Sequence, residues 1–280
     1  TANETAVAVV NRAREKKGLP TVSCGPYPYW LEYGYLEQGR VADARRLLEG
    51  CRAQVGPADH SGHGGKPDPD KSPASSLVQM WTRYLVDTND WGGDVAGWQL
   101  PVGDFPARRV TYEWARGFGA ASRGDFAEAR AALSRLSAAR HDLDANLAKE
   151  ENPGAWTKRA EILEIGLQAM IDAAQGRGEQ ALATLRRASE AEDAMPFEFG
   201  PPFIDKPSRE LLGETLLRLG RPAEARRAFE AALARAPERT ASLEGLEKAA
   251  RAAGDTETAT RVASRLRTIR QRGDAKPGTR

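Results

Sequence analysis

Apolar residues gather into amphipathic stretches with helical spacing along most of the chain, and nowhere do apolar and polar residues alternate over the length of a strand. Ala, Leu, Glu and Arg, all strong helix formers, dominate the composition, whereas Val and Ile are sparse. The pattern predicts an all-α fold with helices near residues 3–16, 27–38, 41–53, 74–88, 91–98, 107–122, 126–150, 154–175, 178–192, 208–219, 222–235, 239–253 and 255–271.

Two stretches interrupt this helical pattern. Residues 55–73 are rich in Gly, Pro and Asp, which is typical of a flexible surface loop. Residues 194–207 (AMPFEFGPPFIDKP) hold three Phe and one Ile among four Pro. Because such an apolar segment, stiffened by prolines, is unfavourable in water, we expect it to be ordered and to pack on the helices, either lining a groove or filling a gap between them.

One short pattern recurs five times: a Gly, followed five residues later by an Ala at the start of an arginine- and glutamate-rich amphipathic segment. The five pairs are Gly39/Ala44, Gly124/Ala129, Gly176/Ala181, Gly220/Ala225 and Gly254/Ala259. The pattern predicts helical hairpins, in which Gly takes a left-handed conformation at the end of the first helix and the small Ala lets the second helix approach closely. A degenerate sixth turn is expected at Asn89–Asp90–Trp91.

The segment Pro207–Pro237 resembles one tetratricopeptide repeat (TPR), a helical hairpin with a period of 34 residues. The resemblance rests on the Leu-Gly pair of the first helix, the turn glycine, the small residue of the second helix and the packing and closing positions: Leu212, Gly213, Gly220, Ala225, Phe229, Ala232 and Pro237. A second copy follows 34 residues later, at Gly254, with Glu247 where the family has Gly. The resemblance implies an α-α superhelix, a TPR-like solenoid of antiparallel hairpins.

The earlier turns are less regular, with 50, 35, 52 and 44 residues between successive ones, which fits longer helices and inserted loops. We therefore expect one continuous solenoid in two parts: degenerate TPR-like hairpins in residues 1–193 and two TPR units in residues 194–280, preceded by the Pro/Phe-rich loop. More loosely, the stretches Trp30–Gly39 and Pro207–Gly213 resemble the C-terminal part of bacterial TPR-containing proteins of unassigned function.

The charge balance disfavours some classes of partner. The net charge is +2, from 41 basic and 39 acidic residues, whereas nucleic-acid binders usually carry a clear basic excess. No apolar run approaches the roughly 18 residues of a bilayer-spanning helix. We therefore expect no nucleic acid among the partners and no membrane insertion.

The two cysteines, Cys24 and Cys51, flank the first clear hairpin, at the ends of its two arms. Because those ends lie side by side in an antiparallel hairpin, we expect a disulfide and hence an extracytoplasmic, periplasmic or secreted, location. Two buried free thiols in a cytoplasmic protein are the alternative. His60 and His63 complete a Cys₂His₂ set, but their spacing is shorter than that of zinc fingers, so we expect no metal and read them as solvated loop residues.

Motifs for catalysis or cofactor binding are missing: the sequence has no GxSxG, HExxH or Walker A motif and no GxGxxG after a strand. We therefore expect a chain that is not an enzyme and needs no cofactor. The leading hypothesis is a protein–protein interaction scaffold that binds a peptide or protein segment in its concave groove. The alternatives are a self-assembling solenoid, as a homo-oligomer or filament subunit, and a small-ligand receptor or enzyme with a site under the 194–207 loop.

Aromatic and loop residues supply the candidate binding surface. Many aromatics should fill the core, but first helices line the groove of a TPR solenoid, so some aromatics of 27–38 are candidates for contact with a partner. The candidate binding residues are Tyr29 and Tyr33 in that helix and Phe197, Phe199, Phe203 and Lys206 in the loop.

Overall fold

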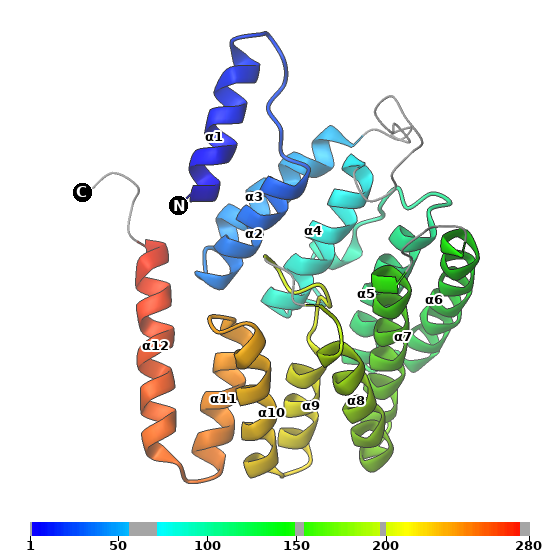
Figure 1. Ribbon diagram of the computed structural model, residues 1–280, viewed down its shortest axis with the longest axis vertical. Coiled ribbons are helices and arrows are strands. Elements are labelled where there is room, and N and C mark those ends of the chain that lie inside the picture. Colours follow the sequence, from blue (N-terminus) through cyan, green and yellow to red (C-terminus); the bar gives the residue numbers. More distant parts are fainter. Residues whose placement is uncertain (1, 56–71, 149–153, 197–199, 275–280) are drawn as a thin grey trace.

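The computed structural model describes residues 2–55, 72–148, 154–196 and 200–274, and within them the chain is helical and contains no strand (Figure 1). None of these helices is long and apolar enough to cross a bilayer. The helices are α1 Ala2–Glu15, α2 Pro26–Glu37, α3 Val41–Gln54, α4 Pro73–Thr88, α5 Pro106–Ser122, α6 Phe126–Leu147, α7 Gly154–Ala174, α8 Gly178–Asp193, α9 Ser208–Arg218, α10 Pro222–Arg235, α11 Thr240–Ala252 and α12 Thr256–Asp274, with a short 3₁₀ helix, η2, at Val95–Gly97.

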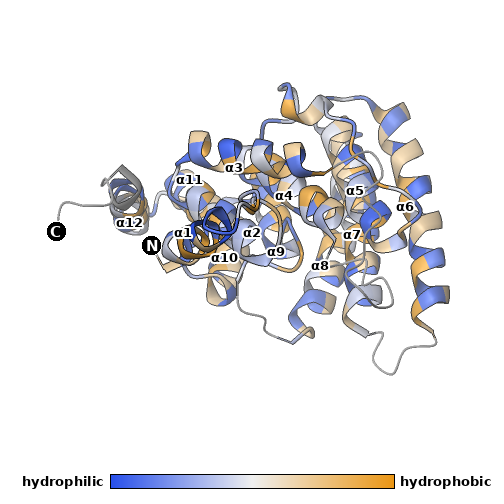
Figure 2. Cartoon of the chain, turned by 90° about the horizontal axis from the view of Figure 1, so that it is seen from above, coloured by the Kyte–Doolittle hydropathy of each residue, from blue (hydrophilic) through white to orange (hydrophobic). Residues whose placement is uncertain are grey.

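Consecutive helices pack as hairpins, and the hairpins stack in chain order into an α-α superhelix. The pairs are α2/α3, α5/α6, α7/α8, α9/α10 and α11/α12. The first helices of the hairpins, together with α4, also contact one another in sequence and therefore line the inner surface. Seen from above, α12 and α6 lie at opposite ends of the molecule (Figure 2).

The five predicted turns are confirmed. Their glycines all have left-handed φ values, between 71° and 82°. The five alanines that follow are buried, four of them with no exposed surface. Asn89, at the degenerate sixth turn, is the one non-glycine residue with positive φ (52°) in the described parts of the chain.

The helix predicted at 91–98 is wrong. This stretch contains only the 3₁₀ turn η2, because Gly92, Gly93 and Gly97 disfavour a helix within so few residues. Side chains of neighbouring helices satisfy its backbone instead: Trp81 Nε1 donates to the carbonyl of Val95 over 2.7 Å.

The predicted disulfide is confirmed. Cys24 and Cys51 are bonded, with a Cα–Cα distance of 4.8 Å. The bond ties the segment before α2 to the end of α3, and both half-cystines are buried. An oxidising location outside the cytoplasm is compatible with this bond.

Candidate binding site

Residues 200–207, which precede α9, lie on the inner surface of the superhelix (Figure 1). Arginines of α4 and α7 bind their main chain. Arg83 of α4 donates to the carbonyl oxygens of Pro202 and Asp205 over 2.8 and 2.7 Å. Arg159 of α7 donates to the carbonyl oxygen of Phe203 over 2.8 Å. The chain's own segment 200–207 thus occupies part of the inner surface.

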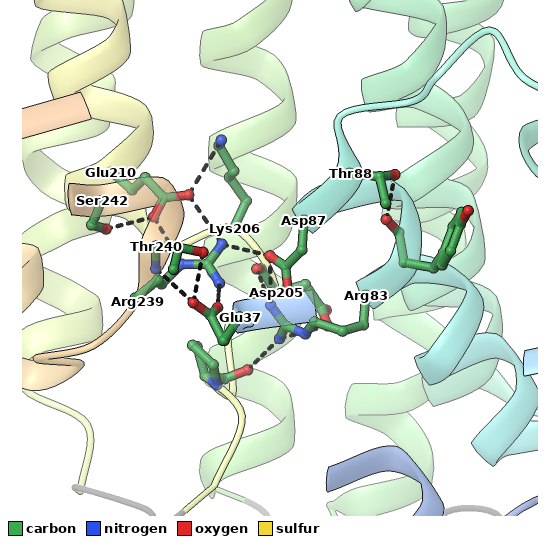
Figure 3. A network of polar contacts seen from close by, with 12 residues as sticks. Glu37, Arg83, Asp87, Thr88, Asp205, Lys206, Glu210, Arg239, Thr240 and Ser242 are labelled. Atoms are coloured by element: carbon green, nitrogen blue, oxygen red, sulfur yellow. Dashed lines mark hydrogen bonds and ion pairs between the residues drawn. The ribbon is translucent and has the colours of Figure 1, made fainter. Parts of the chain in front are cut away.

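The same two arginines share one carboxylate. Asp205 Oδ1 lies 3.3 Å from Arg83 Nη2, and Asp205 Oδ2 accepts a hydrogen bond from Arg159 (Figure 3 shows the Asp205–Arg83 pair). Arg159 also donates to Thr111 of α5 over 2.9 Å. The side chains of both arginines and of Asp205 are at most 5% exposed, so each charge depends on this pairing.

A second group of charges lies beside the first (Figure 3). Arg239 binds Glu210 of α9 through two hydrogen bonds, of 2.8 and 3.1 Å, and Lys206 Nζ lies 3.2 Å from the same carboxylate. Burial alone would raise the pKa of Glu210, but Arg239 and Lys206 outweigh it and lower that pKa to about 2. Glu210 is therefore ionised at neutral pH and holds two buried cations in place.

Glu37, at the end of α2, joins the first hairpin to the last one. Its carboxylate accepts hydrogen bonds from the backbone N–H and the hydroxyl of Thr240, at the start of α11, over 2.5 and 2.8 Å. It also lies 3.3 Å from Arg239, 202 residues away in the chain, while Asp87 of α4 lies 2.9 Å from Arg239 on another nitrogen. Burial, with a smaller contribution from Asp87, raises the pKa of Glu37 to about 7 against the opposing effect of Arg239. The two ends of the superhelix therefore meet through buried charges.

A fifth acidic side chain, Glu32 of α2, is fully buried and accepts no hydrogen bond from any described residue. The four cations of the interior are already matched by four carboxylates: Arg83, Arg159, Lys206 and Arg239 face Glu37, Asp87, Asp205 and Glu210. Burial raises the pKa of Glu32 well above its ordinary value, and the nearby Asp87 adds to the shift, although Arg83 opposes it. Glu32 therefore takes up a proton on folding.

Replacing Glu32 with glutamine is expected to stabilise the fold at neutral and mildly basic pH. Because the carboxyl binds its proton more tightly in the folded chain, its contribution to stability falls as pH rises above the ordinary pKa of about 4.3. Thermal melts of the wild type and Glu32→Gln are compared between pH 4 and pH 8. The two proteins should be nearly equally stable at pH 4, and at pH 8 Glu32→Gln should be more stable by roughly 1 kcal/mol or more in the free energy of unfolding. Glu230→Gln, on the outside of α10, is the control and should show no such divergence. A loss of stability in Glu32→Gln that grows as the pH rises would mean that the carboxylate is ionised and stabilised in the fold.

Beside this interior lies a pocket of about 530 Å³, where the ends of several helices meet. Its walls are mainly apolar and come from α2, the end of α8, the 200–207 segment, the end of α10 and α12; they include Tyr33, Met195, Phe203, Ile204, Ala232 and Ile269. Gly34 leaves an opening in the α2 wall, since a Cβ added there would have no neighbour within 4 Å. The pocket volume is within the range of about 300–1,000 Å³ that is common for ligand sites.

The acidic groups at the pocket are used to cap helices. Neither α9 nor α11 has a side-chain cap of its own. Instead, Glu192 of α8 accepts a hydrogen bond from the backbone N–H of Ser208 over 2.7 Å at the start of α9, and Glu37 does the same for α11. Burial raises the pKa of Glu192, and the bond from Ser208 opposes that shift. Each carboxylate satisfies an otherwise unpaired helix N-terminus.

The basic groups are occupied as well. Arg235 donates to the carbonyl oxygens of Asp193 and Met195, at the end of α8, over 3.1 and 3.2 Å. Arg209 is paired with the carboxylate of Asp193. Most charges of the pocket are therefore used at helix ends; Glu238, also in the lining, is 64% exposed and lies 3.9 Å from Arg265. Among the uncharged side chains of the lining, the Tyr33 hydroxyl and the Gln38 amide keep hydrogen-bonding capacity, since neither bonds to a described residue.

The candidate residues from the sequence fall into three groups. Tyr33 and Phe203 line the pocket. Tyr29 and Lys206 lie at the interior charges instead: the Tyr29 hydroxyl is 3.5 Å from Arg83, and Lys206 is paired with Glu210 and Glu214. Phe197 and Phe199 lie outside the described residues, as do His60 and His63.

The residues that sequence reasoning missed are mainly arginines. Arg83, Arg159 and Arg239 organise the interior, and all three are buried. A signal was present in the case of Arg83, a lone cation within the apolar run of α4 (MWTRYLV), because a charge at such a position needs a buried partner. Sequence alone did not indicate which carboxylate that partner would be.

Family models of the tetratricopeptide repeat match three stretches of this architecture, at residues 210–239, 33–49 and 166–187. The chain is a TPR-like helical repeat protein. The first match spans most of α9, α10 and Arg239, whereas the other two span the turns of the α2/α3 and α7/α8 hairpins with the adjoining parts of their helices. A search of the curated proteins finds no match. TPR repeats generally mediate protein–protein interaction and typically form a non-enzymatic fold, so the family indicates protein partners for this chain.

Proposed function

We propose that this TPR-like chain is a protein-interaction scaffold, not an enzyme, and that the 530 Å³ pocket receives a segment of a partner protein. The pocket is the observation that carries this proposal. The inner surface, which the repeat type would offer to a peptide, is bound to the chain's own segment 200–207 through Arg83 and Arg159. The surface that remains for a partner is therefore the pocket, where Tyr33 and Phe203 present apolar surface.

The chemistry of the pocket supports an uncharged, apolar contact. Most of its carboxylates and guanidinium groups are engaged at helix ends, and the remaining carboxylate, Glu238, is 64% exposed, so solvent screens it from a charged ligand group. Burial of apolar side chains supplies most of the binding free energy at such a site. The disulfide supports a location outside the cytoplasm for both the protein and its partner.

Filling the pocket with an indole is expected to abolish partner binding without loss of fold. Gly34 lies within α2 at the pocket wall and has open space where its Cβ would be, so Gly34→Trp directs a large side chain into the pocket. Peptides selected from a random display library on the wild-type protein should lose at least about tenfold in affinity for Gly34→Trp, measured by fluorescence polarisation.

Two variants control for folding and for the added indole. Gly34→Ala should keep the affinity and gain up to about 1 kcal/mol in the free energy of unfolding, because alanine is the better helix former and meets no neighbour. Arg130→Trp, on the exposed face of α6, should bind as the wild type does. A selection whose peptides all bind Gly34→Trp as well as the wild type would contradict the proposal.

A small-ligand receptor is the second candidate function, and the pocket itself favours it. A partly enclosed volume of about 530 Å³ with mainly apolar walls and a few polar groups is typical of small-molecule sites. In that case a screen of uncharged small compounds would give binders that Gly34→Trp excludes, while the peptide selection would give none.

A further inference from the structure

The pocket continues along α2 onto an exposed aromatic surface. Tyr27, Trp30 and Gly34 are spaced i, i+3 and i+7 and therefore share one face of the helix. Gly34 opens into the pocket, whereas Tyr27 and Trp30 are 60% and 39% exposed. The face thus changes from two exposed rings to an apolar recess within two turns of helix.

Trp30 stands at the rim of the pocket. Gly200 lines the pocket, and a Cβ built on it would lie 2.8 Å from the Trp30 ring. The indole N–H of Trp30 donates to no described residue. We call Tyr27 and Trp30 together the aromatic shoulder. The shoulder extends the site in one direction from the pocket, and a compact small molecule in the pocket would not reach it.

The spacing of the two parts fits one conformation of a bound chain. Tyr27 of the shoulder and Gly34 at the pocket are seven residues apart on α2, or about 10 Å at ~1.5 Å per residue. A polyproline II segment rises ~3.1 Å per residue with three residues per turn, so side chains three positions apart point the same way about 9 Å apart. In a β-strand, side chains on one face are about 6.6 Å apart, or about 13 Å at the next position.

The hydrogen-bonding groups along this face also match. A polyproline II backbone makes no internal hydrogen bonds and presents its carbonyl oxygens to the surface that binds it. Trp30 and Tyr33 of α2 and Gln38, which follows the end of α2, each carry a donor that no described residue uses. Aromatic-lined surfaces are also the usual receptors of such segments, because proline rings pack flat on them.

Resting on the proposed function, we propose that the partner segment is an uncharged, proline-containing stretch in polyproline II conformation, which inserts an apolar side chain into the pocket and places a ring three positions away on the aromatic shoulder. Specificity then comes from the spacing of the two anchors, and the prolines reduce the entropy lost on binding.

The test uses synthetic nine-residue peptides with blocked ends, in which one leucine and one phenylalanine stand in a proline and serine background. Their separation is two, three or four positions, and each separation is made in both chain directions. Affinity for the full chain is measured by isothermal titration calorimetry. The expected result is that the better peptide with a separation of three binds about tenfold or more tighter than those with two or four.

The variants separate the two anchors. Trp30→Ala removes a ring that is 39% exposed and should weaken the best peptide by roughly tenfold. The melting temperature of this variant is measured beside it, to establish that the protein is folded in the assay. Gly34→Trp should abolish binding. Arg130→Trp should bind the best peptide as the wild type does.

Two other results would overturn the inference and leave the proposed function standing. The first is equal affinity for all separations, with binding that Gly34→Trp blocks but Trp30→Ala does not change. The second is tighter binding of an amphipathic helical peptide with apolar residues at i, i+3 and i+7, which also spans about 10 Å. Peptide binding that Gly34→Trp leaves intact would instead defeat the proposed function itself.

Discussion

Replacing Asp205 with alanine is expected to destabilise the protein by about 3–5 kcal/mol in the free energy of unfolding, because it leaves two buried arginines without their shared carboxylate. Arg159 has no other carboxylate within ion-pair distance among the described residues, and Arg83 would keep only Asp87, at 3.7 Å. The loss also loosens segment 200–207, which forms one wall of the pocket. Urea-induced unfolding followed by circular dichroism measures the change.

Matched variants separate burial from charge. Asp205→Asn keeps the shape and the hydrogen-bond acceptor, so its cost should be smaller than that of Asp205→Ala. Asp142→Ala breaks an aspartate–arginine pair on the surface, where the Asp142 side chain is 56% exposed, and should cost less than about 1 kcal/mol. Equal costs for Asp205→Ala and Asp142→Ala would show that the interior pair is solvated and that segment 200–207 is held by other contacts.

The parts of the fold that the sequence predicted are those with local causes. A turn glycine, a small residue five positions later and an amphipathic helix on either side lie within about 30 residues, so the hairpins and the degenerate turn at Asn89 could be predicted. The disulfide followed from the hairpin for the same reason, since Cys24 and Cys51 are 27 residues apart. The helix expected at 91–98 is absent because Gly92, Gly93 and Gly97 disfavour it, which is again a local cause, and side chains such as Trp81 bind the backbone instead.

The interior and the pocket depend on distant parts of the chain. Glu37 meets Arg239 across 202 residues, and Arg83 meets Asp205 across 122. No local pattern states that the ends of the superhelix meet, or that segment 200–207 turns inward. The loop was expected to pack against the helices because of its apolar composition, but the polar residue Asp205 fixes its position as much as its apolar neighbours do.

The two C-terminal repeats show the same limit on a smaller scale. In the sequence, Gly213 matches the glycine of the TPR pattern, whereas the next copy has Glu247 at that position. In the structure, a glycine two residues earlier, Gly245, performs a similar role from the next first helix: it and Gly213 lie against the ring of Phe229. The contact with the Phe229 ring, and not the exact register of the repeat, therefore determines at which of these helix positions a side chain larger than glycine fits.

Phe229→Ala is expected to cost about 3–5 kcal/mol in the free energy of unfolding, because the ring is fully buried between three helices of the C-terminal repeats. Gly245→Ala is expected to cost about 1–3 kcal/mol, even though alanine is the better helix former by up to about 1 kcal/mol, since its methyl group would overlap the ring. Gly34→Ala is the matched control: it is also a helical glycine, but with open space around its Cβ, and its effect should have the opposite sign.

The double variant decides whether the ring causes the strain at Gly245. With Phe229 reduced to alanine, the methyl group of Gly245→Ala meets empty space and fills part of the cavity, so the pair should cost clearly less than the two single changes together. Urea titrations of the four proteins give this coupling free energy, expected at about 1 kcal/mol or more. If the two costs simply add, the backbone at Gly245, and not the Phe229 ring, makes glycine necessary there. The family pattern would then have to be explained by chain conformation instead of by packing between repeats.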